Sequence, residues 1–284
     1  MKGTVYILLP VHNRKKITAN FIACLKNQSY SNYHLILIDD GSNDGTSEMV
    51  RNEIENLTVI TGKGNWWWGG ALHQGYKWIK KNVSDKNSFV LIINDDTEFE
   101  NDFLEAGINI IKNKPKTIIQ AEPYGKKSGK LLEKGIEYDY KKLTFTPTDI
   151  SEKINCLTTR GLLILCNDFI TIGGFYPRLL PHYLSDMEYT IRAFNKGFKP
   201  ITHSDFRLIM LEDETGYGEI EETVFSKFLK KHYNFKNMMN PVHWIAFVFL
   251  ACPFPYNFKN LWLVMKREYY LLSEQWRIDR FEKK

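Results

Sequence analysis

Short runs of apolar residues, separated by stretches with helical spacing, fill the first third of the chain. Val5–Val11, His34–Asp39 and Ser88–Ile93 are runs of this kind, and each has the length of a buried strand. Lys15–Asn27 and Ala71–Lys81 lie between them and repeat apolar residues with the period of a helix. Strands that alternate with helices of about ten residues are typical of βαβ units around a mostly parallel sheet. The sequence therefore predicts an α/β fold.

Each predicted strand ends in polar or acidic residues. His12 and Asn13 follow the first strand, Asp39–Asp40 end the second, and Asn94–Asp96 follow the third. In sheets of this kind, ligands bind at the carboxyl ends of the parallel strands. We expect these three groups to converge on one site.

The acidic strand ends have two interpretations each. Two adjacent carboxylates, Asp95 and Asp96, are costly unless a cation lies beside them. Mg²⁺ needs one or two carboxylates and takes its other ligands from water and phosphates, which favours a metal–diphosphate complex; the alternative is a solvated turn that caps the next helix. Asp39 and Asp40 could accept N–H bonds from a nucleobase, or belong to a turn that caps the helix from Ser47.

Charge is distributed unevenly along the chain. The net charge of +5 conceals a tail of residues 226–284 with 11 Lys and Arg against 4 Asp and Glu, whereas residues 1–225 carry 27 and 29. The charge of the first part argues against a nucleic-acid-binding domain. The tail interleaves basic with aromatic residues, which suits a helix lying on an anionic membrane; the alternative is an extension that packs on the first domain or on a second subunit, as in a homodimer. We therefore predict a domain over 1–225 and a helical extension over 226–284.

Cysteines and the N-terminus indicate the compartment. The four cysteines match no zinc or CxxC spacing, and three lie in apolar runs, so we expect free thiols. The N-terminal apolar run is too short for a signal peptide, and no run reaches the ~18–20 apolar residues of a spanning helix. These features predict a cytoplasmic protein, peripheral on the inner face of the cell membrane if the tail binds lipid.

The motifs resemble a known family when taken in order. PVHNR, LILIDDGSNDGT, a segment with Gly-Gly-Ala and LIINDDT are followed by RGLLILCNDFITIGGF and SDMEYTIRA. Their order and spacing resemble family 2 glycosyltransferases of the GT-A fold over about two thirds of the chain, Val5–Gly197. The segment Trp66–Ala71 is most similar to the branch that includes rhamnosyltransferases of surface-polysaccharide synthesis.

The resemblance implies a fold and a reaction. The fold is a GT-A-like, Rossmann-like, mostly parallel sheet flanked by helices. The reaction is an inverting transfer of a sugar from a nucleoside-diphosphate donor, UDP or dTDP, to a hydroxyl of a glycan or lipid-linked acceptor in polysaccharide biosynthesis. The base would be a carboxylate, and a divalent metal, Mg or Mn, would neutralise the leaving diphosphate.

The resemblance also implies roles for single residues. Asp186 falls at the position of the catalytic base, Glu188 on a second catalytic acid, and Asp96 on the metal ligand. Donor binding is implied for these positions: Pro10, Val11, Asn13, Asp39, Asp40, Asn65, Trp67, Trp68, Asn94, Asp95, Arg160 and Gly161. Many relatives also use a histidine on the metal or diphosphate, and that position falls near Met210–Leu211, just before the acids of 212–214.

Plainer alternatives stand beside these roles. Acids such as Asp186 and Glu188 are common at helix N-termini, and Arg160 could be a surface residue at a strand start. The tryptophans 66–68 could belong to the core, although three consecutive side chains cannot all point one way.

Two other function classes remain. A nucleotidyltransferase that makes a sugar nucleotide would want a glycine-rich basic loop after the first strand, and PVHNRKK lacks the glycines. A non-catalytic glycan-binding protein on the same fold is the second alternative.

Overall fold

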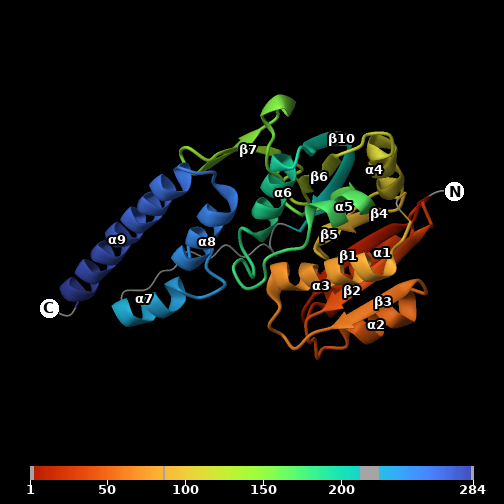
Figure 1. Cartoon of the computed structure of the whole chain (residues 1–284). Helices are drawn as coiled ribbons and strands as arrows, with labels where there is room; N and C mark the ends of the chain where they lie inside the picture. Colours follow the sequence, from red (N-terminus) through yellow and green to blue (C-terminus); the bar gives the residue numbers. More distant parts are fainter. Residues whose placement is uncertain (1–2, 86, 212–223, 283–284) are drawn as a thin grey trace.

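An eight-stranded sheet forms the centre of the molecule in the computed structural model, which describes residues 3–85, 87–211 and 224–282 (Figure 1). Its strand order is β3-β2-β1-β4-β9-β6-β10-β5, and β9 and β5 run against the others. The strands of the sheet are β1 (Val5–Val11), β2 (Tyr33–Asp39), β3 (Leu57–Thr61), β4 (Phe89–Ile92), β5 (Thr97–Glu98), β6 (Thr117–Gly125), β9 (Leu162–Leu165) and β10 (Lys199–Met210). The predicted α/β fold with a mostly parallel sheet is confirmed.

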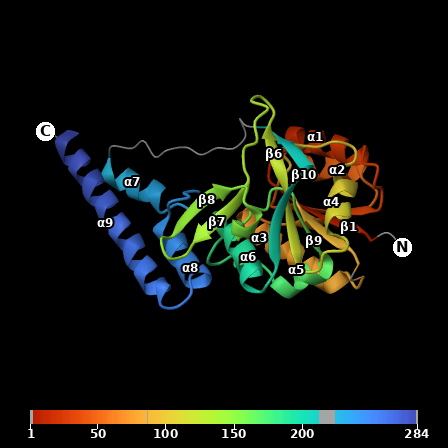
Figure 2. The same ribbon diagram turned by 90° about the horizontal axis from the view of Figure 1, so that it is seen from above.

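Helices cover both faces of this sheet, because its central strands are apolar on both sides. Ile7 and Leu9 of β1 pack toward one helical layer, and Leu8 packs toward the other. The first layer contains α1 (Lys15–Lys26), α2 (Thr46–Glu53) and α4 (Phe103–Ile111). The second contains α3 (Trp67–Asn82), α5 (Cys166–Ile172) and α6 (Ser185–Asn195). Figure 2 shows the two layers from above.

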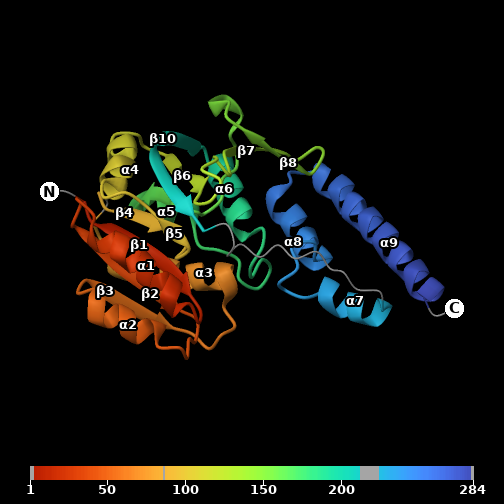
Figure 3. The same ribbon diagram turned by 180° about the vertical axis from the view of Figure 1, so that it is seen from behind.

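The C-terminal part is helical, as predicted, and extends to one side of the sheet (Figure 3). It comprises α7 (Phe225–His232), α8 (Pro241–Ala251) and α9 (Tyr256–Glu282). Helix α8 begins where Asn240 accepts a hydrogen bond from the Val242 amide and a proline occupies the first turn, a favoured N-terminal arrangement. The domain boundary at 225 stays a prediction.

A third apolar cluster joins this extension to the rest of the protein. Trp244 and Phe247 of α8 pack with Tyr138 of a two-stranded hairpin, β7 (Gly135–Asp139) and β8 (Thr144–Thr148). The hairpin lies in the polar segment that follows β6. A 3-10 turn, η1 (Ser151–Lys153), follows it.

Three smaller predictions can also be compared with the structure. The predicted helix over 71–81 begins earlier, at Trp67, so two of the tryptophans are helical. All four cysteines are free, and Cys156, Cys166 and Cys252 are buried. Among the described residues, each helix is too short or too polar to cross a bilayer.

Candidate functional site

Three polar strand ends meet at one edge of the sheet, as the sequence predicted. Strands β1, β2 and β4 are parallel neighbours, with Val11 opposite Asp39 and Leu8 opposite Ile92. The acid triplet begins two residues after the end of β4, and it therefore lies beside the end of β1. Strand β9 runs the other way and pairs Leu162 with Ile92, so its first residues reach the same edge.

Asp40 is fully occupied by backbone amides. Its Oδ1 accepts from the N–H groups of Gly64 at 2.8 Å and Asn65 at 3.2 Å, and its Oδ2 accepts from those of Trp66 at 2.7 Å and Trp67 at 3.2 Å. A carboxylate offers about four acceptor positions, so these four donors use them all. This geometry contradicts the prediction that Asp40 receives a nucleobase: the side chain instead holds the turn that starts α3.

Asp39 shapes the preceding turn. Its Oδ1 accepts from the Ser42 amide at 2.7 Å, and its Oδ2 accepts from the Ser47 hydroxyl. Both bonds lie within the Asx-rich segment, so the turn-forming alternative describes Asp39 better than direct contact with a donor.

The Arg14 side chain forms ion pairs with the acid triplet, a contact that the sequence did not predict. The Arg14 Nε lies 2.9 and 3.1 Å from the two carboxylate oxygens of Asp95, and an Arg14 terminal nitrogen lies 3.4 Å from Oδ2 of Asp96. The Thr18 hydroxyl donates to Asp95 at 2.8 Å. Burial raises the pKa of the Asp95 carboxyl, and the Arg14 charge opposes that rise. Arg14 follows directly after the first predicted strand end, and that position was the only signal.

The residues at this edge fit a hard divalent cation. Two carboxylates beside one guanidinium leave a net negative charge, and the buried Oδ1 of Asn94 has no hydrogen-bond partner in the described chain. Oxygen ligands with one net charge suit Mg²⁺ or Mn²⁺ when most other ligands come from water and a diphosphate. In the described ranges, no three His, Cys, Asp or Glu side chains are grouped to hold a metal alone.

The position near Met210–Leu211, where the resemblance implied a histidine, lies beside the acid triplet. The Leu211 amide donates to the carbonyl oxygen of Asp96 at 3.1 Å, so the position that the resemblance assigned to a histidine lies beside the acids. Leucine has no ligand atom to offer, and the acids of 212–214 lie outside the described residues.

Asp186 lies in the first turn of α6 within a second charged cluster. Its Oδ1 accepts from the Met187 amide at 2.9 Å. Burial raises the pKa of the Asp186 carboxyl, and the positive charge of Arg160 opposes the rise. Arg160 is itself bound to Glu133 at 3.2 Å, and burial also raises the pKa of Glu133. A half-buried carboxylate with a raised pKa, such as that of Asp186, is suited to general-base catalysis. Glu133 lies between β6 and β7, and no pattern in the sequence marked it as a site residue.

Glu188 occupies a structural position. It is 1% exposed, and its two oxygens accept from the Arg192 guanidinium at 2.8 and 3.0 Å. Arg192 also donates to the carbonyls of Ile172 at 2.7 Å and Gly174 at 2.9 Å. The structure therefore contradicts a catalytic role for Glu188, because both oxygens hold the arginine that fixes the turn after α5.

The tryptophans join separate parts of the protein. All three are half-buried, and the Trp68 indole N–H donates to the Thr159 hydroxyl at 3.0 Å. The Trp67 ring lies 6.0 Å from the His182 ring, and the Lys236 ammonium lies 5.4 Å from the Trp67 ring centre. Burial lowers the pKa of His182 to about 4, and Lys236 adds to this shift. Trp67 thus faces the loop before Asp186 and a residue of the C-terminal extension.

The remaining predicted donor positions are distributed along the same edge. Pro10 is half-buried and Val11 buried at the end of β1, and Asn65 is exposed. Asn13 is hydrogen-bonded through its backbone and side chain to the turn after β2. Gly161 has φ +70°, and a Cβ there would lie 2.8–2.9 Å from neighbouring side chains, so this position needs glycine.

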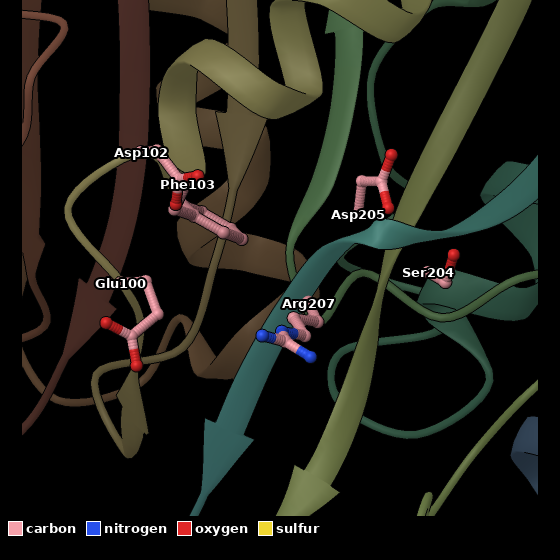
Figure 4. A pocket seen from close by; sticks show the side chains of 6 residues that line it. All are labelled: Glu100, Asp102, Phe103, Ser204, Asp205 and Arg207. Atoms are coloured by element: carbon pink, nitrogen blue, oxygen red, sulfur yellow. The ribbon is translucent and has the colours of Figure 1, made fainter.

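A separate cavity of about 250 Å³ lies near the start of α4 and the bulge in β10 (Figure 4). Six residues line it: Glu100, Asp102, Phe103, Ser204, Asp205 and Arg207. None of the predicted site residues is among them, so this cavity is not the candidate site.

Comparison with known proteins places this geometry in context. The model of the family described as Glycosyl transferase family 2 matches residues 6–165. An uncharacterized glycosyltransferase of Haemophilus influenzae is 44% identical over 52 residues, which is 18% of this chain and 20% of that protein, so the match spans about a fifth of the curated relative.

Solved structures share the fold over nearly the whole chain. A mannosyltransferase of Pyrobaculum calidifontis, PcManGT, in complex with GDP-Man and Mn²⁺ has a TM-score of 0.57 at 14% identity, covering 97% of this chain and 72% of that one. S. aureus TarS has a TM-score of 0.59 at 17% identity, covering 98% and 53%. TarS 1-349 in complex with UDP-GlcNAc has a TM-score of 0.59 at 16% identity, covering 94% and 73%. These likenesses show the fold.

Proposed function

Since the chain belongs to glycosyl transferase family 2 and is a glycosyltransferase of the GT-A fold, we propose that it transfers a sugar, with inversion, from a UDP- or dTDP-sugar to a hydroxyl acceptor. The acceptor is a glycan or a lipid-linked glycan, and the product belongs to a surface polysaccharide, with rhamnosyl transfer as the starting hypothesis for the sugar. The complexes of similar folds with GDP-Man and UDP-GlcNAc support a sugar-nucleotide donor.

One observation supports the proposal: Arg160 comes just before β9, which pairs with the end of β4, and its charge acts on Asp186 of α6. Strand β9 begins beside the end of β4, which puts Arg160 and Gly161 next to the triplet Asn94–Asp96. Arg160 is also close enough to Asp186 for its positive charge to oppose the rise that burial causes in the pKa of this carboxyl. This arrangement supports a site in which Arg160 lies between the diphosphate and the base.

The chemistry follows from these positions. The ionised Asp186 carboxylate takes the proton of the acceptor hydroxyl while that oxygen bonds to the anomeric carbon. The bond from the anomeric carbon to the diphosphate oxygen breaks, and the nucleoside diphosphate leaves with the electron pair. Arg14 and Arg160 donate to the phosphates. Asp96, with Asp95 and Asn94 beside it, would hold a divalent Mg or Mn ion, which when bound neutralises charge on the leaving group.

A donor panel tests the proposal. The full chain is incubated with UDP- and dTDP-sugars, with Mn²⁺, Mg²⁺ or a chelator, and release of nucleoside diphosphate is measured. We expect release from one donor, dependent on the metal, and loss of transfer in Asp186→Asn with donor binding retained. Absence of release with every donor, together with glycan binding, would indicate a binding protein; formation of pyrophosphate from a nucleoside triphosphate and a sugar phosphate would indicate a nucleotidyltransferase.

A further inference from the structure

One side of α9 carries a row of large apolar side chains exposed to solvent. The row consists of Phe258, Trp262, Met265, Tyr269 and Trp276, which are 45–69% exposed. Their separations of three, four and seven residues put them on one face of a helix. Figures 1 and 2 show α9 at the outer edge of the molecule, with α7 and α8 packed only on its inner side. We call these five residues the α9 stripe.

The opposite side of α9 fixes the direction of the stripe. Asn260, Val264 and Glu268 follow one another at helical spacing and are at most 7% exposed. Glu268 accepts from the His232 ring at 2.9 Å and from the Tyr233 hydroxyl at 2.9 Å, which ties α9 to α7. The stripe therefore faces outward because the other side of the helix is held inside.

A basic row runs beside the stripe. The Lys266 ammonium lies 5.0 Å from the Trp262 ring, and the Arg280 guanidinium lies 4.1 Å from the Trp276 ring. Arg277 is exposed on the same flank. Of the acids of α9 with described side chains, Glu274 is exposed and its helical position is about 150° from the middle of the stripe, whereas Asp279 is half-buried. The exposed face is thus aromatic and positively charged.

We propose that the α9 stripe is a membrane-binding surface that takes a bilayer containing anionic lipid. Tryptophan and tyrosine favour the membrane interface, where their rings enter the headgroup region. The basic row lies where phosphate headgroups would meet it, and that attraction strengthens binding. In this arrangement α9 lies along the surface of the bilayer.

A second copy of the chain is the competing occupant. The spacing of the stripe also fits a coiled-coil seam, which would pair two α9 helices. In such a pair, however, the basic flank of each helix finds no acidic row among the described side chains of its partner, because Glu268 is buried, Asp279 is half-buried and accepts from the Phe225 amide of α7, and Glu274 points elsewhere. Charge complementarity therefore favours the anionic membrane.

Vesicle flotation of the full chain tests the proposal. Phosphatidylcholine vesicles with phosphatidylglycerol are compared with phosphatidylcholine alone, and binding to the anionic vesicles only is expected. Trp262→Ser with Trp276→Ser should weaken binding at least about tenfold, through lost aromatic burial. Lys266→Gln with Arg277→Gln and Arg280→Gln should weaken it on the order of a hundredfold, through lost charge. Ile150→Ser with Leu179→Ser is the matched control, because these side chains are 48% and 46% exposed outside the extension and should leave binding unchanged.

The outcomes separate membrane binding from its competitor and from the reaction. Equal flotation of the stripe variant and wild type, or equal binding to both vesicles, overturns the proposal. So does a wild type that ignores vesicles and forms a dimer in light scattering that the stripe variant loses. Circular dichroism confirms that each variant is folded. Donor hydrolysis without vesicles is expected to be the same in wild type and in the stripe variant, Trp262→Ser with Trp276→Ser. A failure of the proposed reaction is therefore distinguished from a failure of membrane binding.

Discussion

Replacement of Asp40 by asparagine should lower the stability of the protein, because this side chain organises the turn before α3. Its four amide donors belong to consecutive residues, Gly64 to Trp67, and the Asp40 side chain is 7% exposed. Asparagine keeps one oxygen for two of these donors. Its amide group would then point two N–H donors at the other two amides, which lose their acceptor.

The magnitude follows from the bonds that are lost. The Oδ2 atom accepts one short bond of 2.7 Å and one longer bond of 3.2 Å. A hydrogen bond to a charged group contributes about 1.5–3 kcal/mol, and the longer bond lies at the weak end of that range or below it. We therefore expect Asp40→Asn to lower the free energy of unfolding by about 2–4 kcal/mol. Asp44→Asn is the matched control: Asp44 accepts from Lys15 and Thr46 in the exposed neighbouring turn, where asparagine also caps well, so less than about 1 kcal/mol is expected.

Urea unfolding followed by tryptophan fluorescence measures the stability, and calorimetric titration with UDP and dTDP measures nucleotide binding. If Asp40 has a structural role, Asp40→Asn lowers the urea midpoint, and any loss of nucleotide binding occurs together with this loss of stability. The reasoning is refuted if Asp40→Asn unfolds at the wild-type midpoint yet no longer binds nucleotide, since that result would return Asp40 to the nucleobase.

Three further predictions concern α6. Asp186→Asn should lower the rate of transfer by about 10²–10⁴-fold without changing donor binding; a rate close to wild type would remove Asp186 from the base position. The base must be ionised, and burial raises the pKa of Asp186, so kcat should fall with decreasing pH through a pKa above that of an ordinary aspartate. Arg160→Met removes the positive charge that opposes this rise and should move the acid side of the pH profile to higher pH. An unchanged pH profile argues against an interaction between Arg160 and Asp186. Glu188→Gln should leave Arg192 buried without its ionic partner and cost about 3–5 kcal/mol in thermal or urea unfolding; unchanged stability with lost activity would restore a catalytic role.

Local patterns predicted the sheet and the meeting of its strand ends. Val5–Val11, His34–Asp39 and the run before Asn94 are buried on both faces, so their apolar composition was sufficient to identify them. Their common direction follows from the helices between them, because a parallel pair needs a crossover. The edge that carries the acids could therefore be predicted without long-range contacts.

Strand direction and charge pairing could not be predicted in the same way. The run Leu162–Leu165 has the composition of a buried strand whichever way it runs, yet only its reversed direction brings Arg160 to the end of β4. Glu133 meets Arg160 across 27 residues of chain, and nothing near Glu133 indicates that contact. Glu188 resembled a functional acid because the sequence does not show which way its side chain points or that Arg192 holds it.

The segment Trp66–Gly70, whose tryptophans suggested donor binding, connects three separate parts of the protein. Its first amides bind Asp40 at the end of β2, and the Trp68 indole binds Thr159 just before Arg160. The Gly69 amide donates to the carbonyl of Pro181 at 2.8 Å, in the loop that leads to Asp186, and a Cβ at Gly69 would lie only 2.5 Å from the Leu180 carbonyl oxygen. One short segment therefore contacts the end of β2, the residue before Arg160 and the loop that leads to Asp186. Glycine is required at the closest of these contacts because backbone meets backbone there, so this contact fixes the loop that carries Asp186 against the start of α3.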